Sequence, residues 1–284
     1  MEGTDDPVLV VADIVGPTVL GQGTAAGRRC TLIRLGGCNL SCSWCDTPFA
    51  WDSTRFDLGR HLAQWSATQV ALTALSCNPA LVVVTGGEPM LQQRSPGWPV
   101  LLRALSGVEV GLETNGTIAP SEDTLRGVSW VTVSPKLAHA GDPSWERIKG
   151  DVLMTWGRLA YSHDIEFVFV VRDSTDVATV NTLVLVHGLP ANRVWVSPEG
   201  TTTASVVTRL HEVADAALDA GFNVAPRIVN PFGGSVAARR VATELDALSA
   251  SGPAASTVPP GPLLDLAADP EPAPAPSGAR FKRT

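Results

Sequence analysis

The chain has 284 residues and a formal net charge of −7. An acidic balance excludes a general nucleic-acid-binding surface, which would be strongly basic. No apolar run reaches the roughly 20 residues of a membrane-spanning helix, and the acidic start, Met-Glu-Gly-Thr-Asp-Asp, lacks the positive charge of a secretory signal. Five cysteines, three of them clustered, indicate a metal site in a reducing compartment. We therefore expect a cytoplasmic protein without nucleic-acid or membrane partners.

Strand and helix patterns alternate along most of the chain. Apolar, β-branched runs predict strands at 8–15, 30–35, 80–85, 108–113, 130–134, 166–171, 193–196 and 222–224. Apolar residues at helical spacing predict helices at 57–76, 99–106, 121–126, 143–159, 173–187 and 204–220. Asp57 is the expected N-cap of the first helix. Repeated βα units indicate parallel strands joined by crossover helices.

Four polar motifs each follow a predicted strand. They are Thr85-Gly86-Gly87-Glu88-Pro89, Glu113-Thr114-Asn115-Gly116, Ser134-Pro135-Lys136 and Ser197-Pro198-Glu199-Gly200. In a βα barrel the carboxyl ends of the strands converge on one face, where active sites form. We therefore predict an α/β fold, a partial (incomplete) TIM-like βα barrel, with its site on this rim.

The composition divides the chain near residue 235. Residues 1–235 are the expected partial-barrel domain, and residues 236–284 begin with a short predicted helix at 239–248. From residue 249 onward the chain is rich in Pro, Ala, Ser and Gly. Such a segment has too little apolar surface to offset the entropy of ordering, so we expect a disordered C-terminal tail.

Three cysteines, Cys38, Cys42 and Cys45, follow the strand predicted at 30–35 in a Cys-x3-Cys-x2-Cys pattern. Cysteine thiolates are the usual ligands of [4Fe–4S] clusters, and three ligands for four irons leave one iron open. A zinc ion held by these thiols and His61 is an alternative, and inert buried thiols are a third possibility. Against zinc, His61 lies in a predicted helix. Cys30, within a strand, is expected in the core.

With Trp44 before its last cysteine, this motif resembles the radical S-adenosylmethionine superfamily. The strings GPTVLGQG, RLGGCNLSCSWCDT, TGGEP, ETNGT and SPKL resemble the 7-carboxy-7-deazaguanine synthase family more closely. The resemblance implies a lyase that converts 6-carboxy-5,6,7,8-tetrahydropterin to 7-carboxy-7-deazaguanine, with ring contraction and loss of ammonia, in queuosine-type 7-deazapurine biosynthesis. It implies a [4Fe–4S] cluster, S-adenosyl-L-methionine and Mg²⁺ as cofactors. It also implies a small-molecule substrate, an external flavodoxin- or ferredoxin-type electron donor and a homodimer.

The resemblance also assigns site residues, motif by motif. The implied cofactor contacts are Trp44, Gly86, Gly87, Glu88, Thr114, Asn115, Ser134, Lys136 and Ser197; the implied substrate contacts are Leu20, Gln22, Arg34, Asp46 and Thr85; and Thr47 is the implied Mg²⁺ ligand. Glu88 would offer its carboxylate to the amino group of the cofactor. From the residues alone, Asp46 and Thr47 could instead form an Asx-turn, and Arg34 could pair with a structural carboxylate.

Two regions depart from the family pattern. The family opens with Gly-Pro-Thr-Val-Gln-Gly-Glu-Gly, and here Leu20 and Gln22 replace the glutamine and the glutamate. Val229 stands where relatives carry a histidine. Because a polar pocket rejects a substrate that lacks its partner groups, one alternative is a radical enzyme acting on a different pterin, a nucleoside or a peptide. A non-catalytic iron–sulfur or zinc-binding protein is the other alternative.

Overall fold

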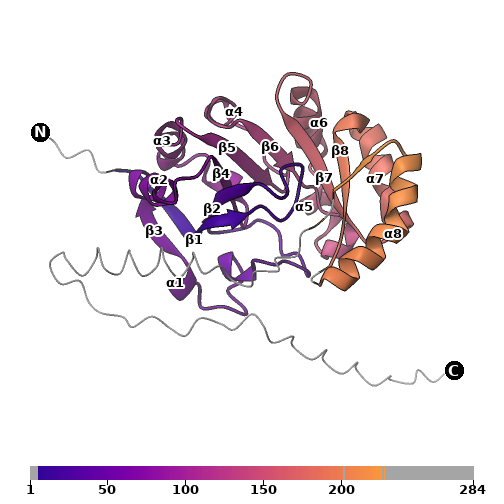
Figure 1. The fold of residues 1–284 in the computed structure, drawn as a ribbon, viewed down its shortest axis with the longest axis horizontal. Helices are drawn as coiled ribbons and strands as arrows, with labels where there is room; N and C mark the ends of the chain where they lie inside the picture. Colours follow the sequence, from indigo (N-terminus) through magenta and orange to yellow (C-terminus); the bar gives the residue numbers. More distant parts are fainter. Residues whose placement is uncertain (1–5, 201, 226, 228–284) are drawn as a thin grey trace, which may run out of the picture.

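In the computed structural model, which describes residues 6–200, 202–225 and 227, nine strands form one sheet (Figure 1). They are β1 (Val8–Val19), β2 (Arg29–Leu35), β3 (Ala63–Ser66), β4 (Leu81–Gly86), β5 (Glu109–Thr114), β6 (Trp130–Val133), β7 (Ile165–Val171), β8 (Val194–Pro198) and β9 (Asn223–Val224). Their order is β3-β1-β2-β4-β5-β6-β7-β8-β9. The edge strands β3 and β9 do not pair, so the predicted incomplete barrel is confirmed.

Strand direction changes once across the sheet. β1 is antiparallel to both β2 and β3, and each pair from β2–β4 to β8–β9 is parallel. The helices are α1 (Leu58–His61), α2 (Ala67–Ser76), α3 (Gly97–Ala104), α4 (Glu122–Gly127), α5 (Ser144–Arg147), α6 (Gly150–Leu159), α7 (Ser174–His187) and α8 (Thr203–Asp219). Four short 3-10 helices are η1 (Pro48–Ala50), η2 (Pro89–Gln92), η3 (Ala138–Ala140) and η4 (Ala191–Arg193). From β4 onward, strands and helices alternate as predicted. The helix predicted at 239–248 and the predicted tail lie outside the described residues.

The single helix predicted at 57–76 is wrong. Asp57 does cap a helix, because its side chain accepts a hydrogen bond from the Gly59 amide, but α1 ends at His61. The next residues form β3, which pairs with β1, and the Ser66 side chain then accepts a hydrogen bond from the Gln69 amide to start α2. The apolar spacing fits a helix, but pairing with an edge strand overrides it. The helix predicted at 143–159 is likewise divided, by extended backbone at Ile148.

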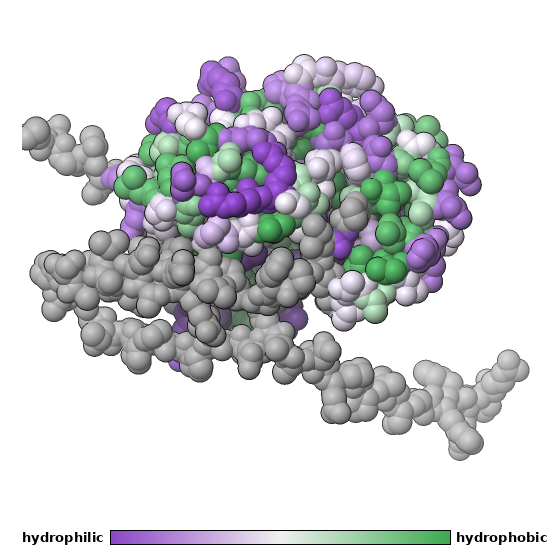
Figure 2. All heavy atoms as spheres, in the orientation of Figure 1, coloured by the Kyte–Doolittle hydropathy of each residue, from purple (hydrophilic) through white to green (hydrophobic). Residues whose placement is uncertain are grey.

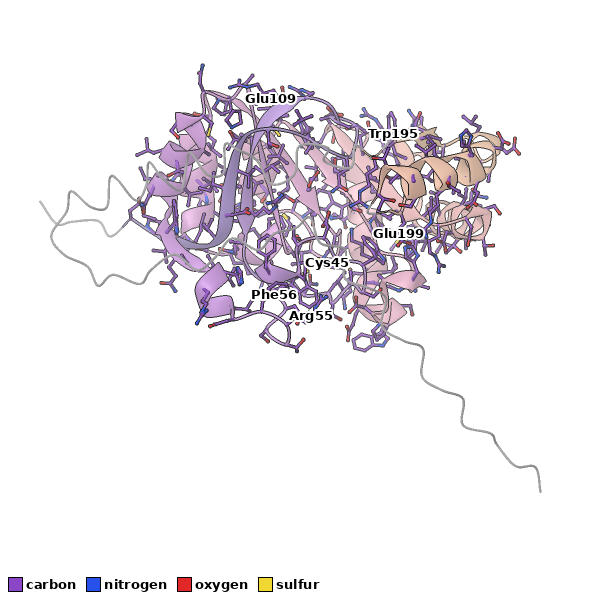
Figure 3. All side chains as sticks on the ribbon, turned by 60° about the horizontal axis from the view of Figure 1, so that its bottom comes forward. Cys45, Arg55, Phe56, Glu109, Trp195 and Glu199 are labelled. Atoms are coloured by element: carbon purple, nitrogen blue, oxygen red, sulfur yellow. The ribbon has the colours of Figure 1, made fainter. Side chains whose placement is uncertain are left out.

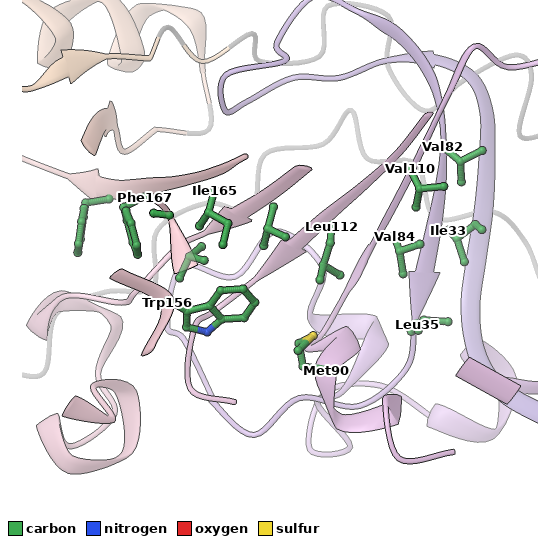
Figure 4. Packing of buried hydrophobic residues seen from close by; sticks show 14 of the residues in the cluster. Ile33, Leu35, Val82, Val84, Met90, Val110, Leu112, Trp156, Ile165 and Phe167 are labelled. Atoms are coloured by element: carbon green, nitrogen blue, oxygen red, sulfur yellow. The ribbon is translucent and has the colours of Figure 1, made fainter. Parts of the chain in front are cut away.

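The two faces of the sheet differ because successive side chains of a strand point to opposite sides. The helix-covered face carries the main core, which includes Ile33, Leu35, Val82, Val84, Met90, Val110, Leu112, Trp156, Ile165 and Phe167 (Figure 4). The other face carries a smaller cluster of Leu20, Ala25, Cys30, Leu81, Val83 and Trp130. Cys30 is 1% exposed, so its predicted place in the core is confirmed. Toward the carboxyl ends of the strands, this second face becomes polar.

The outer surface mixes hydrophilic and hydrophobic side chains (Figure 2). On the face shown, hydrophobic atoms gather toward the end of the molecule that holds α7 and α8. Exposed apolar residues of these two helices include Leu185, Val186, Val207 and Leu218. Among the described residues, no helix is both long enough and apolar enough to cross a membrane.

A charged pair at the amino end of β5 gives a testable stability effect. The Arg28 guanidinium donates to both carboxylate oxygens of Glu109, at 2.7 and 2.6 Å. The Trp130 indole N–H donates to the same carboxylate. These hydrogen bonds, that of Arg28 above all, hold the pKa of Glu109 below its ordinary value of 4.5. We expect Glu109→Gln to lower the free energy of unfolding by about 1 kcal/mol at pH 7, because the pair is partly exposed.

The pH dependence of this effect follows from the sign of the shift. A lowered folded-state pKa stabilises the protein fully above pH 4.5, and this contribution disappears as the pH falls through the folded-state pKa. Urea unfolding of wild type and variant at pH 7 and pH 3 should therefore show a difference that shrinks in acid. The exposed Glu212 supplies a control, Glu212→Gln. An equal difference at both pH values would contradict the assignment.

Candidate active site

The carboxyl ends of β2, β4, β5 and β6 bring polar side chains together on the face opposite the helices. Arg34 and Thr85 are register partners on β2 and β4, and the Thr85 hydroxyl donates to Glu113 of β5 at 2.9 Å. Ser134 follows β6 directly and accepts a hydrogen bond from the Lys136 ammonium at 2.9 Å. The predicted convergence of motifs on one rim is therefore present for the motifs after β4, β5 and β6.

The cysteine loop, residues 36–47 between β2 and η1, lies over this rim and makes hydrogen bonds to the loops that follow β4, β5 and β6. The Glu88 amide donates to the Gly37 carbonyl at 2.7 Å. The Asn115 side-chain amide donates to Asn39 at 2.9 Å. On the β6 side, the buried carboxylate of Asp142 accepts hydrogen bonds from the amide and hydroxyl of Ser41. Each of the loops after β4, β5 and β6 thus holds one part of the cysteine loop.

Gly86 and Gly87 are required by the packing of the protein itself. Gly86 has a φ of +138°, a conformation that side-chain-bearing residues rarely adopt. A Cβ at Gly86 would overlap the backbone of Leu35, and a Cβ at Gly87 would overlap the Gly37 carbonyl. The close backbone approach expected from these glycines therefore occurs between β4 and the start of the cysteine loop.

Glu88 is fully buried, and its carboxylate is occupied by protein donors. One oxygen accepts hydrogen bonds from the Met90 amide at 2.9 Å and the Thr114 hydroxyl at 2.8 Å, and the other accepts from the Asn115 amide at 2.7 Å. Burial raises the pKa of Glu88, against the opposing effect of these hydrogen bonds. Glu88 thus joins the Gly-Gly-Glu-Pro and Glu-Thr-Asn-Gly loops through its side chain, and its contact with a cofactor stays a prediction.

Trp44 is held between two side chains that follow β6. Its ring stacks on His139, with centroids 5.6 Å apart, and the Lys136 ammonium lies 5.6 Å from the Trp44 ring centroid. His139 Nδ1 lies 3.4 Å from the carboxylate of Asp176, which accepts hydrogen bonds from Arg172. The Trp44 indole N–H is buried without a partner among the described residues.

The residues after the last cysteine form a charged end of the site. Asp46 accepts a hydrogen bond from the Arg227 guanidinium at 3.1 Å, which ties the cysteine loop to the C-terminal end of the described chain. The Thr47 hydroxyl lies 3.8 Å from Cys45 Sγ. Arg34 pairs with Asp13 through one guanidinium nitrogen, at 2.9 Å, so the structural alternative for Arg34 is present. Its other guanidinium nitrogens remain available for a ligand.

Two further predicted contacts lie apart from these groups. Leu20 is 3% exposed and packs with Cys30 and Leu81 in the smaller core cluster. Ser197 lies in β8 and is 2% exposed. The substrate contact of Leu20 and the cofactor contact of Ser197 stay predictions. Gln22 is half-buried in the loop that leads from β1 to β2. Val229 lies outside the described residues.

The three thiols suit a cluster better than a single ion. Within the described part of the chain, no group of three His, Cys, Asp or Glu side chains is placed to hold one metal ion, and His61 lies beside Phe49 and Phe56. A cubane instead binds each thiolate through a different iron, so its ligands surround a volume rather than a point. Burial raises the pKa of Cys38 to about 12 and also raises that of Cys42, and a bound cation would favour the thiolate form of these sulfurs.

Donors around the sulfurs support the same fit. The Leu40 amide lies 3.5 Å from Cys38 Sγ, and the Trp51 indole N–H lies 3.3 Å from Cys45 Sγ. Hydrogen bonds to the sulfurs are a common feature of iron–sulfur sites. The unpartnered N–H of Trp44, packed against the same cysteines, is a further donor that a bound group would satisfy.

Several residues of this site had no signal in the sequence. Four residues contact the predicted motifs but belong to no pattern with a known spacing: Asp142, His139, Arg227 and Trp51. Asp142 and Arg227 act across 101 and 181 residues of chain. Only the position of Trp51, six residues after Cys45, could have suggested a link to the cysteine loop.

An open βα sheet with a three-cysteine loop over its carboxyl-end rim defines a partial-barrel enzyme with a candidate cluster site. No protein-family model matches the chain. The 7-carboxy-7-deazaguanine synthase of Pyrobaculum aerophilum is 35% identical over 212 residues, or 73% of this chain and 87% of the relative. That of Halobacterium salinarum is 31% identical, over 80% of this chain and 91% of the relative. This chain belongs to the 7-carboxy-7-deazaguanine synthase family.

A solved structure agrees on the fold. The crystal structure of QueE from Escherichia coli matches with a TM-score of 0.56 and 22% identity, covering 77% of this chain and 93% of that chain. At this identity the match supports the fold alone. The partial barrel predicted from the alternating βα pattern is therefore also found in a solved structure.

Proposed function

We propose that this chain is a radical S-adenosylmethionine lyase that forms 7-carboxy-7-deazaguanine from 6-carboxy-5,6,7,8-tetrahydropterin. The observation that carries the proposal is the cysteine loop, held by Glu88, Asn115 and Asp142 over a rim lined by charged side chains. The family relatives with 31–35% identity support the same activity.

In this proposal Cys38, Cys42 and Cys45 hold a [4Fe–4S] cluster. The cluster and S-adenosyl-L-methionine, when bound, supply the radical chemistry that removes a hydrogen atom from the substrate. Trp44 packs against the small cluster that contains Cys42, and Lys136 lies over the Trp44 ring, so the two residues offer an aromatic face and a cation to the cofactor. The Gly86–Gly87 turn and Glu88 hold the cysteine loop in place beside the cofactor.

The charged rim fits the two ends of the pterin. The substrate carboxylate is an anion, and Arg34 and Lys136 provide positive charge at the carboxyl ends of the strands. The pyrimidine edge carries N–H donors, for which Glu113 and Asp46 are carboxylate acceptors. Burial raises the pKa of Glu113 and the nearby Asp46 raises it further. A cation such as Mg²⁺ beside Thr47 would favour the charged form of Glu113.

Product analysis tests the activity directly. Reconstituted protein is incubated without oxygen with a reductant, S-adenosylmethionine and 6-carboxytetrahydropterin, and the products are separated by chromatography with mass detection. We expect 7-carboxy-7-deazaguanine to form. Cleavage of S-adenosylmethionine without a deazapurine would instead favour the alternative of another pterin, nucleoside or peptide substrate. A protein that binds no iron would refute both.

The altered substrate loop gives a sharper test. Leu20→Gln buries an amide among apolar side chains and should lower the free energy of unfolding by about 1–3 kcal/mol. Gln22→Glu restores the family's carboxylate at a half-buried position and should raise pterin turnover modestly, by up to about tenfold for one hydrogen bond. Turnover and urea unfolding of both variants check this. A stable Leu20→Gln protein with higher turnover would support the predicted substrate contact at position 20.

Four further parts of the proposal rest on the family resemblance and the sequence. They are a flavodoxin- or ferredoxin-type electron donor, a homodimeric assembly, a cytoplasmic location, and a barrel domain that ends near residue 235. Sedimentation analysis of the full chain, and of a chain that ends at residue 235, tests the assembly and the domain limit.

A further inference from the structure

One tryptophan outside the predicted site touches a candidate cluster ligand. The Trp51 indole N–H donates to Cys45 Sγ at 3.3 Å. In the described part of the chain, no side-chain N–H reaches the sulfur of Cys38 or Cys42, and Cys38 receives only the backbone amide of Leu40, at 3.5 Å. The surroundings of the three sulfurs are therefore unequal, and Cys45 has the only side-chain N–H donor among them.

The position of Trp51 is fixed by two consecutive turns. Trp51 is the C-cap residue of η1, and its amide donates to the Pro48 carbonyl at 3.1 Å. The carbonyl of the preceding residue, Ala50, accepts from the Gly37 amide at 2.8 Å. The next residue, Asp52, is buried and accepts hydrogen bonds from the amide and hydroxyl of Thr54. Figure 3 shows Cys45 on the same side of the molecule as Arg55 and Phe56, in this second turn. The hydrogen-bonded turns before and after Trp51 thus hold its indole toward the Cys45 sulfur.

An N–H group aimed at a cluster sulfur changes how readily the cluster takes an electron. Reduction adds negative charge, which spreads onto the sulfurs, and the positive end of the N–H dipole stabilises that charge. Hydrogen bonds to the sulfurs are one of the features that set the reduction potential of iron–sulfur clusters. The same N–H would also make the iron bound through Cys45 unlike the other two that carry thiolates.

We propose that Trp51 sets the reduction potential of the cluster through Cys45, its indole N–H making the cluster easier to reduce. The proposal rests on the proposed function, because it requires the cysteine loop to hold a cluster. Trp51 acts on the ligand sulfur, and among the described residues its indole makes no hydrogen bond to Arg34, Asp46 or Glu113. It is therefore a positioning residue, which acts on the cluster through the Cys45 sulfur. It differs from Trp44, whose N–H has no partner among the described residues.

The test is a redox titration of the reconstituted full-length protein, followed by the electron paramagnetic resonance signal of the reduced cluster. Two variants are compared with wild type: Trp51→Phe, and Trp51 replaced by benzothienylalanine, which keeps the shape of the ring but has no N–H. At the wild-type midpoint potential we expect about tenfold less reduced relative to oxidised cluster in both, a shift of about 59 mV to more negative values for a one-electron couple.

Trp195→Phe is the matched control. The Trp195 indole N–H also makes one hydrogen bond, to Glu166 at 2.7 Å, but Trp195 lies well apart from Cys45 (Figure 3). This variant should keep the wild-type potential. An unchanged potential in both Trp51 variants, or a shift with phenylalanine but not with the ring-shaped analogue, would overturn the proposal while the proposed function stands. If the Trp51→Phe protein does not retain its cluster, the reduction potential of the benzothienylalanine variant decides between these outcomes. A wild-type protein that binds no cluster refutes the proposed function itself.

Discussion

Alanine in place of Cys38, Cys42 or Cys45 should remove the cluster from the reconstituted protein and reduce S-adenosylmethionine cleavage to background. Each thiolate holds one iron corner, and the loop offers three ligands for four irons, so none is redundant. Iron and sulfide per chain, together with 5′-deoxyadenosine formation, measure the two effects. Because bound cluster stabilises the folded state by mass action, the variants should also unfold at lower temperature than reconstituted wild type.

The other two cysteines provide matched controls. Cys30 is buried, and burial raises its pKa to about 11, so it remains a neutral thiol within the core. Cys30→Ala should keep the full cluster and cost about 1 kcal/mol of stability for the small cavity. Cys77, the C-cap residue of α2, can be replaced by serine with no loss of iron. Full iron content and cleavage in any variant of Cys38, Cys42 or Cys45 would refute the ligand assignment.

The sequence was sufficient for features that depend on local spacing. The strand predicted at 80–85 corresponds to β4 because a continuous β-branched run suits a strand buried on both faces. The motifs that begin at Thr85, Glu113 and Ser134 could be placed on one rim because the carboxyl ends of parallel strands share an edge of the sheet. The candidate cluster ligands in the cysteine loop were predicted from residue type and spacing alone.

Features that depend on contacts distant in sequence could not be predicted. β3 forms because residues 63–66 pair with β1. The spacing of apolar residues within 63–66 does not predict this pairing. The side chain of Leu20 packs in the smaller core cluster with Leu81, Val83 and Trp130, which lie far along the chain. Asp142 and Arg227 reach the cysteine loop only after the chain has passed through several strands.

Glu88 shows most clearly how a motif can be recognised from the sequence while the contacts of its side chain depend on the fold. A carboxylate beside two glycines at the end of a strand suggests a ligand contact. The fold instead surrounds it with three donors from two loops, and leaves it fully buried. A buried carboxylate with three hydrogen bonds fixes its donors in position, and here two of those donors belong to Thr114 and Asn115. The Asn115 side chain in turn holds Asn39 of the cysteine loop.

Removing this carboxylate should therefore have a large effect on stability. Glu88→Ala leaves the Met90 amide, the Thr114 hydroxyl and the Asn115 amide without their acceptor in a buried site. At about 1–3 kcal/mol for each unsatisfied group, we expect a loss of about 4 kcal/mol or more, a large part of the stability of a typical domain. Glu88→Gln can keep the acceptor for Met90 and Thr114 but turns an N–H₂ group toward the Asn115 N–H, so we expect about 2 kcal/mol.

Urea unfolding of the cluster-free protein measures these losses apart from any cofactor. Thr114→Val removes one donor and should cost about 1 kcal/mol. Combined with Glu88→Ala it should cost less than the sum, because the alanine has already broken that hydrogen bond. If the carboxylate instead served a ligand directly, Glu88→Ala would unfold like wild type and lose only its affinity for S-adenosylmethionine. A stable variant with weakened cofactor binding would therefore return Glu88 to the cofactor site, whereas a stability loss that is shared with Thr114 places it in the scaffold that holds the cysteine loop.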